Sequence, residues 1–481
     1  MAQEQAEAAP YRRKGLTPLS WAAKGGHEEV VKMLLKRDDV NVNAADEEGQ
    51  TPLFIAAGGG YDGIVKMLLE RCDVDPNITN QYGETPLYIA AWMGHEGVMK
   101  MLLERKDIKP DTVDDLTGET PLFRAAWEGF EEIVKMLLER KDVNPSAVDE
   151  QGQTPLFGAA REGHERVVKM LLDHVDVNPN TTDNYGRAPL SIAAGAEREG
   201  VVGILLERWD VNPNTQNEYG ETPLSIAAWE GHEGVARMLL ERNDINPDAR
   251  DNLASETPLF IAARGGRMGI VKMLLEQSSV NPNIRDQFDQ TPLFIAAREG
   301  HKGVIKLLLE RADVKPDTAD KYGETPLYEA ASEGHVDVVK MLLERNDVNP
   351  NFEDSSGQTP LFAAAGNGHE GVVKVLLERN DVNPNIADSS GQTPLFIAAR
   401  RGRTTAVKRL LERIDVDTHL TDIDGETALW HALDRGNDAI VKLLSEHRNF
   451  IPALDGDELT TPPSSEPSHT GQRPSKRFRR F

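Results

Sequence analysis

Seven histidines recur at one position of a repeated sequence, and histidine is a side chain suited to metal binding and to acid–base catalysis. They are His27, His95, His164, His232, His301, His335 and His369. Successive members lie one whole repeat apart, and packed helices are separated by about 8–10 Å. That distance is too large for one metal ion to be shared. The pattern therefore predicts a structural role for these histidines.

Other short motifs that resemble metal, nucleotide or catalytic sites do not have the residue spacing that those sites require. The stretch DIDGE at 422–426 resembles part of a calcium loop, but the twelve-residue register would require Leu420 and His431 as its first and last ligands. The glycines at 58–60 lack the Gly-Lys-Ser/Thr of a phosphate-binding loop, and the chain has neither HExxH nor a nucleophile-elbow string. Every recurring titratable residue has a place in the repeat. We therefore expect no enzyme activity, no cofactor and no metal.

The charge and cysteine content narrow the classes of partner and compartment. The 481 residues carry a net charge of -25, so duplex nucleic acid would be repelled and a basic protein or peptide is the expected partner. Cys72 is the single cysteine, which excludes an intrachain disulfide and fits a reducing compartment. The chain has no apolar run of about 18 residues and hence no expected membrane span. We expect a monomeric, cytoplasmic protein, with the nucleus as an alternative location.

A repeat of 34 residues, lengthened to 35 at two steps, organises the chain. Its cap position falls at 17, 51, 85, 120, 154, 188, 222, 257, 291, 325, 359, 393 and 427, and holds Thr everywhere except at Ala188. In TPLFIAAREGH (291–301) the Thr caps a helix that begins at Pro292, and Gly300 ends it. The following KGVIKLLLER predicts a second helix with one apolar face. Such a unit is stable only when stacked on its neighbours, which predicts an all-α solenoid.

These residues resemble a known family. The pattern D-x-x-G-x-T-P-L, A-A, G-H, V-V-x-x-L-L, D-V-N is that of ankyrin repeats, here in thirteen copies covering 14–449. The ending LLERxDVNPN is similar to long ankyrin arrays of filamentous fungi. The resemblance implies stacked helix–turn–helix units with projecting turns or short hairpins, used to bind proteins. We expect residues 1–13 and the Pro/Ser/Thr-rich residues 450–481, with their basic end, to be disordered tails.

The position three residues after the cap departs from that family. Ankyrin repeats usually have His there, whereas this chain has Phe in seven repeats, Tyr in two, Ser in three and Trp430 in the last. The imidazole link of the family is therefore absent. Regularly spaced aromatic rings on stacked units favour a packing ladder over a ligand-binding stripe.

The resemblance also implies where a partner binds, because ankyrin contacts come from the turn before Thr-Pro-Leu and from the end of the first helix. The turn sites are Tyr82, Tyr185, Tyr219, Phe288 and Tyr322, and the helix-end sites are Trp92, Trp127 and Trp229, with Glu128 and Glu230 beside Trp. Aromatics ringed by carboxylates on a concave face would suit a basic partner. The alternative is that the exposed aromatics only shield the turns.

We therefore expect a non-catalytic scaffold for protein–protein interaction. One alternative is a nuclear regulatory cofactor that uses KRFRR (476–480), a stretch that fits either an import signal or a solvated charge cluster. Another is the sensor array of a fungal receptor-like system. Within the array, repeat six lacks the cap Thr, the Gly-His pair and the Lys of its second helix, which predicts a soft point at 188–205 unless packing hides the defect.

Overall fold

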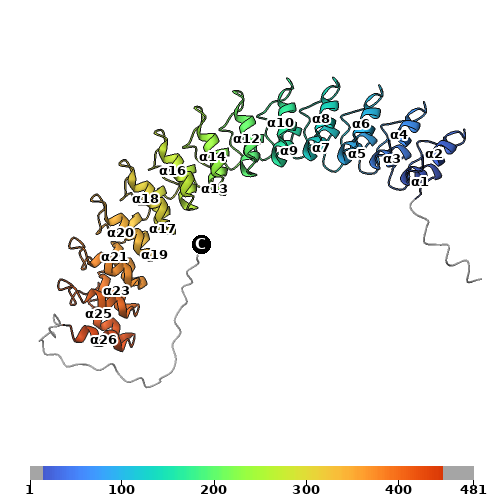
Figure 1. Ribbon diagram of the computed structural model, residues 1–481. Helices are drawn as coiled ribbons and strands as arrows, with labels where there is room; N and C mark the ends of the chain where they lie inside the picture. The colour runs from blue at the N-terminus through green and yellow to red at the C-terminus, as the bar shows by residue number, and fades with distance from the viewer. Residues whose placement is uncertain (1–14, 448–481) are drawn as a thin grey trace, which may run out of the picture.

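The computed structural model describes residues 15–447, which form a curved stack of 26 α-helices arranged as thirteen pairs (Figure 1). This confirms the predicted all-α solenoid. The described residues contain no β-strand, only an isolated bridge between Thr421 and Thr427. The predicted tails 1–13 and 450–481, and the outermost residues of the predicted array 14–449, lie outside the described part.

Each repeat contributes one helix to each of two layers. The first helices are α1 (Pro18–Lys24), α3 (Pro52–Gly58), α5 (Pro86–Met93), α7 (Pro121–Glu128), α9 (Pro155–Glu162), α11 (Pro189–Gly195), α13 (Pro223–Glu230), α15 (Pro258–Arg264), α17 (Pro292–Glu299), α19 (Pro326–Glu333), α21 (Pro360–Asn367), α23 (Pro394–Arg400) and α25 (Ala428–Asp434). The second helices are α2 (Glu28–Leu35), α4 (Asp62–Leu69), α6 (Glu96–Leu103), α8 (Glu131–Leu138), α10 (Glu165–Leu172), α12 (Glu199–Leu206), α14 (Glu233–Leu240), α16 (Met268–Glu276), α18 (Lys302–Glu310), α20 (Val336–Leu343), α22 (Glu370–Leu377), α24 (Thr404–Leu410) and α26 (Asp438–Ser445). None of these helices has the length and apolarity needed to cross a bilayer.

The first helices begin where the sequence predicts. In all repeats except the sixth, the hydroxyl of the cap Thr accepts a hydrogen bond from the main-chain N–H three residues later. Pro occupies the first helical position, where no hydrogen bond is lost, in every repeat except the last, which has Ala428 there. Ala188 has no such bond, so α11 starts without a side-chain cap.

Two positions of every repeat have a left-handed backbone, and together they account for all positive φ angles in 15–447. One is nine residues after the cap, at the end of the first helix, and the other is two residues before the cap, in the turn. Glycine occupies these positions except at Glu197, Ser255 and Asp289. Glu197 lies in repeat six, so that repeat combines a missing cap with a residue that disfavours its backbone conformation.

The seam between repeats determines the curvature. The paired alanines of the first helices are buried, so neighbouring first helices approach more closely than neighbouring second helices, and the first helices line the concave side (Figure 1). The aromatic residues three positions after the cap are buried at this seam, except Trp430. Burial supports the packing interpretation, but within residues 15–447 these aromatic rings do not contact one another from repeat to repeat as a ladder. Tyr88 instead meets Trp92, and Phe123 meets Trp127, within one helix.

The recurring histidines link neighbouring repeats. From His95 to His369, each donates a ring N–H to a main-chain carbonyl near the end of the preceding first helix, over 2.8–3.0 Å. Arg198, Arg267 and Arg403 make the same link in three of the six repeats that lack His at this position. The predicted structural role of this position is confirmed, and repeat six keeps the link through Arg198.

The R-x-D-V-N-P-N loops, or clamping loops, which follow the second helices, also hold successive repeats together. We did not predict this role from the sequence. In ten repeats the Arg forms a two-pronged ion pair with the Asp, and in nine it also donates to a Leu carbonyl of the preceding repeat. In seven repeats the second Asn donates to a carbonyl of the next loop and accepts from its N–H.

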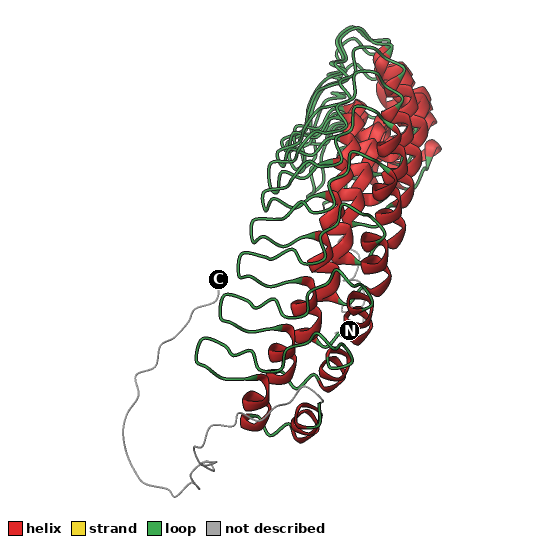
Figure 2. Cartoon of the chain, turned by 90° about the vertical axis from the view of Figure 1, so that its left-hand side faces the viewer, coloured by secondary structure: helices red, strands yellow, loops and turns green. Residues whose placement is uncertain are grey.

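The turns before the first helices project from one side of the helix layers (Figure 2). From repeat three onward, each turn tip donates a main-chain N–H to a carbonyl of the preceding tip, as Asp115 does to Tyr82. Within the turn, an Asp or Asn such as Asp320 accepts two further amides through Oδ1. The turns therefore form a fixed platform rather than independent loops.

Candidate partner-binding surface

The five aromatic residues predicted at the turns are exposed at the platform. Their exposed fractions range from 39% for Phe288 to 57% for Tyr322. Tyr185 and Tyr219 lie on adjacent turn tips, in repeats six and seven, as do Phe288 and Tyr322, in repeats nine and ten, while Tyr82 stands apart in repeat three. The turn sites are thus two pairs and a single residue on a fixed backbone.

The predicted helix-end residues lie at the carboxyl ends of α5, α7 and α13, in the layer that lines the concave side. Trp229 is 57% exposed, Trp92 is 36% exposed and Trp127 is half-buried. Glu128 and Glu230, each directly after a Trp, are exposed. Trp92 and Trp127 occupy adjacent repeats, whereas Trp229 lies three repeats further along. The structure therefore provides two separate aromatic sites along the arch.

Each of the three tryptophans is covered on one face by a cation from the following repeat. The guanidinium carbons of Arg124, Arg161 and Arg264 lie 4.9, 5.2 and 5.1 Å from the ring centres of Trp92, Trp127 and Trp229 respectively. This geometry is that of a cation–π contact. The turn aromatics are similar, since Lys321 lies 4.2 Å from the Phe288 ring centre and 4.9 Å from that of Tyr322. The aromatic faces are therefore already in contact with positive charge.

Carboxylates hold these cations in place. Arg124 forms an ion pair with the buried Glu119 and approaches Glu128 at 3.8 Å. The hydroxyl of Tyr88 donates to Glu119 over 3.2 Å, and burial raises the pKa of both the tyrosine and the glutamate. Arg264 pairs with buried Glu256 in the same way. The surface thus alternates aromatic rings, guanidinium groups and carboxylates.

Two carboxyl groups, those of Glu324 and Glu329, interact in repeat ten. Burial raises the pKa of Glu329 to about 7, and the neighbouring Glu324 contributes in the same direction. Protonated Glu329 is therefore substantially populated near neutral pH, where it relieves the repulsion between the two groups. The position four residues after the cap, held by Glu329, is Ile in seven repeats but Arg124 in repeat four and His431 in the last. We did not predict this variable position, although a comparison of the thirteen copies would have revealed it.

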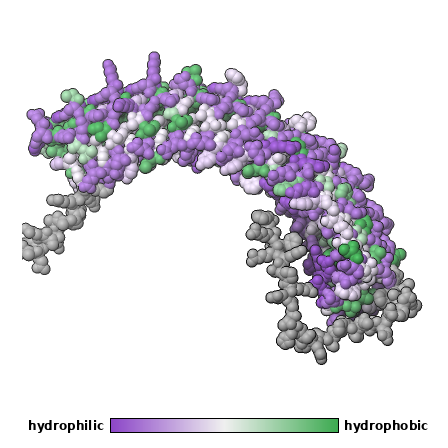
Figure 3. Space-filling model, turned by 180° about the vertical axis from the view of Figure 1, so that it is seen from behind, coloured by the Kyte–Doolittle hydropathy of each residue, from purple (hydrophilic) through white to green (hydrophobic). Residues whose placement is uncertain are grey.

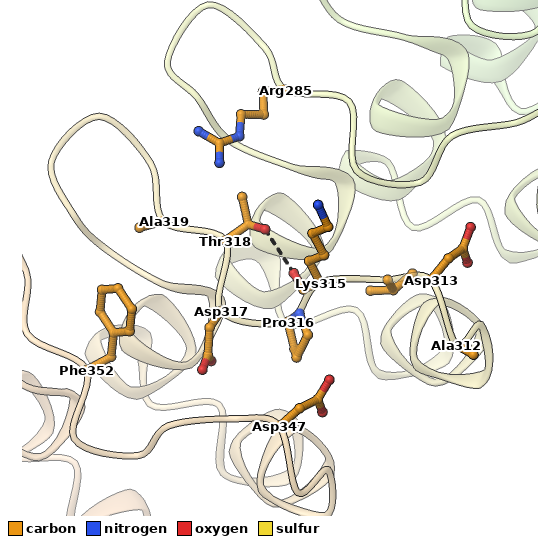
Figure 4. Close-up of a pocket in the computed structure, with 11 residues that line it drawn as sticks. Arg285, Ala312, Asp313, Lys315, Pro316, Asp317, Thr318, Ala319, Asp347 and Phe352 are labelled. Carbon is orange, nitrogen blue, oxygen red and sulfur yellow. Dashed lines mark hydrogen bonds between the residues drawn. The ribbon is translucent and has the colours of Figure 1, made fainter.

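The most pronounced depressions among residues 15–447 are not lined by Trp92, Trp127 or Trp229. A depression of about 900 Å³ lies among the loops after α16, α18 and α20, lined by residues that include Arg285, Lys315, Asp317 and Phe352 (Figure 4). It is formed by the clamping loops. The rear surface is mainly hydrophilic with scattered hydrophobic positions (Figure 3). Neither feature provides a deep apolar pocket for a small molecule.

Comparison with known proteins agrees with this architecture. The family described as "Ankyrin repeats (3 copies)" matches the chain in nine overlapping windows, at 2–80, 60–147, 141–217, 175–251, 209–286, 259–354, 312–388, 346–420 and 370–455. No curated protein matches the chain.

Proposed function

Because the chain belongs to the ankyrin-repeat family, whose arrays typically serve as protein-binding scaffolds, we propose that it binds a basic protein or extended peptide on its concave side. Ankyrin repeats are generally non-catalytic, and in this proposal the chain acts by binding alone. The single observation that carries the proposal is the set of partly exposed tryptophans with cations over their rings and carboxylates alongside.

The internal cation–π contacts indicate which chemistry these sites accept. A guanidinium group over Trp92 is stabilised by the ring and by nearby Glu119 and Glu128 together. A partner Arg or Lys can dock on the remaining exposed ring area, or take the place of the internal Arg and use the same carboxylates. The net charge of -25 adds long-range attraction for a basic partner.

The turn aromatics extend the proposed site beyond the helices. Tyr219 lies in the same repeat as Trp229, and Tyr185 lies one repeat earlier. A peptide running along the arch therefore meets the two turn tyrosines and the tryptophan together. Their main-chain carbonyls are already bonded to the next turn, so little ordering is needed when a partner binds. In this proposal, repeats six to eight form the larger of the two anchor sites.

The test starts by capturing partners from native lysate with the untagged full chain and identifying the contacting peptide by cross-linking. Binding of that synthetic peptide is then measured by calorimetry with Trp92→Ala, Trp127→Ala and Trp229→Ala. Each truncation of an anchoring Trp is expected to cost about 2 kcal/mol. The affinity is also expected to fall as salt is raised.

Trp209 provides a matched control, because it is 90% exposed but follows α12 on the convex layer. Trp209→Ala should leave the affinity unchanged. If the triple variant binds the peptide as tightly as the wild type, or Trp209→Ala weakens binding equally, the concave site is wrong. If the captured peptide is acidic, the proposed charge of the partner is wrong.

We place this activity in the cytoplasm and assign it to a monomer, with nuclear entry through residues 476–480 as the alternative. Cys72 is a free thiol, as a reducing compartment allows. Light scattering tests the monomer, and microscopy of fluorescent fusions with and without residues 473–481 tests the location.

A further inference from the structure

The last repeat gathers three metal-ligating side chains at one point. Nε2 of His431, in α25, lies 3.0 Å from Oε2 of Glu426 and 3.6 Å from Oδ2 of Asp422, both in the turn that precedes the helix. One ligating atom from each residue lies within 4.8 Å of the other two. Among the described residues, this is the one group of at least three His, Cys, Asp or Glu side chains with that arrangement.

The His431 side chain is only 14% exposed, and its ring nitrogens lack the hydrogen bonds that would normally accompany burial. Both of its ring nitrogens are inaccessible, and neither makes a hydrogen bond, despite the short distance to Glu426. Phe396 packs against the ring with centres 4.6 Å apart, and Trp430 does so at 4.9 Å. A buried polar atom without a partner calls for an explanation, and an unplaced ion is one of the few that apply.

The turn holds the carboxylate of Asp422 in a defined arrangement. Oδ1 of Asp422 accepts the main-chain N–H groups of Asp424 and Glu426 at 3.0 and 2.9 Å. These bonds fix the carboxylate and leave its other oxygen, Oδ2, facing His431. The side chain of Asp422 is only 6% exposed, so water satisfies little of its charge. One fixed carboxylate and the carboxylate of Glu426 thus lie beside an imidazole whose nitrogens make no hydrogen bond.

We propose that Asp422, Glu426 and His431 bind a divalent first-row transition-metal ion, zinc being the best fit. Ligand atoms about 2.0 Å from a tetrahedral zinc ion lie about 3.3 Å apart. The two distances from His431 bracket that value. Calcium fits less well, because it takes six to eight oxygen ligands and this cluster offers a nitrogen and two carboxylates. Water would complete the coordination.

The site has a structural consequence for the end of the array. Repeat thirteen is the last of the stack within residues 15–447, and Trp430 is 45% exposed there, although its counterparts are buried. A metal ion would join the turn, through Asp422 and Glu426, to the helix that carries His431. Such a bond would stabilise the terminal repeat, since a ligand that binds only the folded state adds to stability.

Zinc titration by calorimetry of the untagged, chelator-treated full chain tests the proposal. The wild type should bind a single zinc ion, and His431→Ile, Asp422→Asn and Glu426→Gln should each bind it at least tenfold more weakly, since loss of even an outer-shell partner costs about 10- to 100-fold. Each substitution introduces a residue that other repeats carry at the same position, as in Ile295, Asn217 and Gln358. The variants should therefore fold normally.

His369→Arg is the matched control, because Arg403 occupies the same position in the next repeat and that histidine belongs to the inter-repeat link. This variant should bind zinc as the wild type does. Failure of the wild type to bind zinc, or unchanged zinc affinity in His431→Ile, would overturn the site. Calcium binding as tight as zinc binding would overturn the assignment of metal class. None of these outcomes depends on the proposed protein partner.

Discussion

Asp317 occupies a position in the clamping loop where seven repeats have Asn, and replacing it with Asn should stabilise the protein. In those repeats the Asn side-chain N–H donates to a carbonyl of the next loop over 2.6–2.8 Å. Asp317 keeps the other half of the arrangement, because its Oδ2 accepts the N–H of Asn349 at 2.7 Å. Its Oδ1 is buried and has no hydrogen-bond partner. Asp317 therefore places a hydrogen-bond acceptor, Oδ1, at the position where the Asn residues place an N–H donor.

The magnitude follows from that mismatch. Asp317→Asn would gain one hydrogen bond, worth about 0.5–1.5 kcal/mol net, and would remove an unsatisfied buried acceptor, which costs about 1–3 kcal/mol. Because the residue is partly exposed, we expect a gain of about 1–2 kcal/mol at neutral pH. Asp111 and Asp248 have the same unpaired oxygen in repeats three and seven. Their substitutions should add to the effect, since the sites are well separated.

The pH dependence provides a second check. Burial raises the pKa of Asp317, so the folded state favours the protonated form more than the unfolded chain does. Stability from this group is therefore complete in acid and lost as the pH rises through the folded pKa. A protonated carboxyl can donate as the Asn amide does. The advantage of Asp317→Asn should consequently be greatest at neutral pH and shrink in acid.

The assay is urea unfolding followed by circular dichroism, together with native-state hydrogen exchange in repeats nine and ten. Asn351→Asp, at the same position one repeat later, is the matched reverse change and should destabilise at neutral pH by a comparable amount. Exchange localises the effect even if the array unfolds in stages. The reasoning is refuted if neither Asp317→Asn nor Asn351→Asp changes the urea concentration at the midpoint of unfolding.

Three further predictions concern repeats six and ten. Glu197→Gly should raise the melting temperature, because relief of a left-handed non-glycine backbone, about 1–2 kcal/mol, exceeds the entropy lost by introducing glycine, about 0.4–1 kcal/mol; a lower melting temperature contradicts this. Hydrogen exchange should be faster at 188–205 than in neighbouring repeats, and Ala188→Thr should slow it by restoring a cap worth about 1 kcal/mol; protection equal to that of the neighbours would show that packing compensates. The pKa of Glu329 is raised to about 7, so its contribution to stability is complete in acid and declines as the pH rises through that value. Wild-type stability should fall from mildly acidic to mildly alkaline buffer, and Glu329→Gln should flatten this dependence; parallel profiles would contradict the assignment.

Much of the fold could be predicted because it is local and repeated. Thr291, Pro292 and Gly300 specify the start and end of one helix through their own backbone chemistry, and thirteen copies made the periodicity unmistakable. The structural role of the recurring histidines followed from their spacing alone. The aromatic ring at Phe294 was correctly placed in the buried seam.

The candidate binding residues were less completely predictable. Trp92 and Trp229 could be placed at helix ends by counting, but Arg124 and Arg264, which cover them, come from the following repeat. Their approach depends on how two repeats are rotated and stacked, which no single copy of the sequence encodes. The lack of a hydrogen-bond partner for Oδ1 of Asp317 could not be predicted for the same reason, since Asp and Asn have nearly the same shape and fit the loop equally well.

The sequence by itself determined the helices, the two left-handed positions in each repeat and the stacking of thirteen units, because these depend on residues close together in the chain. The tertiary structure decided which side chains meet across the seams, as His431 meets the carboxylates of its own turn and the ring of Phe396 in the preceding repeat. The physical reason is that hydrogen bonds, ion pairs and metal ligation require particular distances and directions. Those are set by the packing between helices and turns, which the repeat pattern specifies only on average.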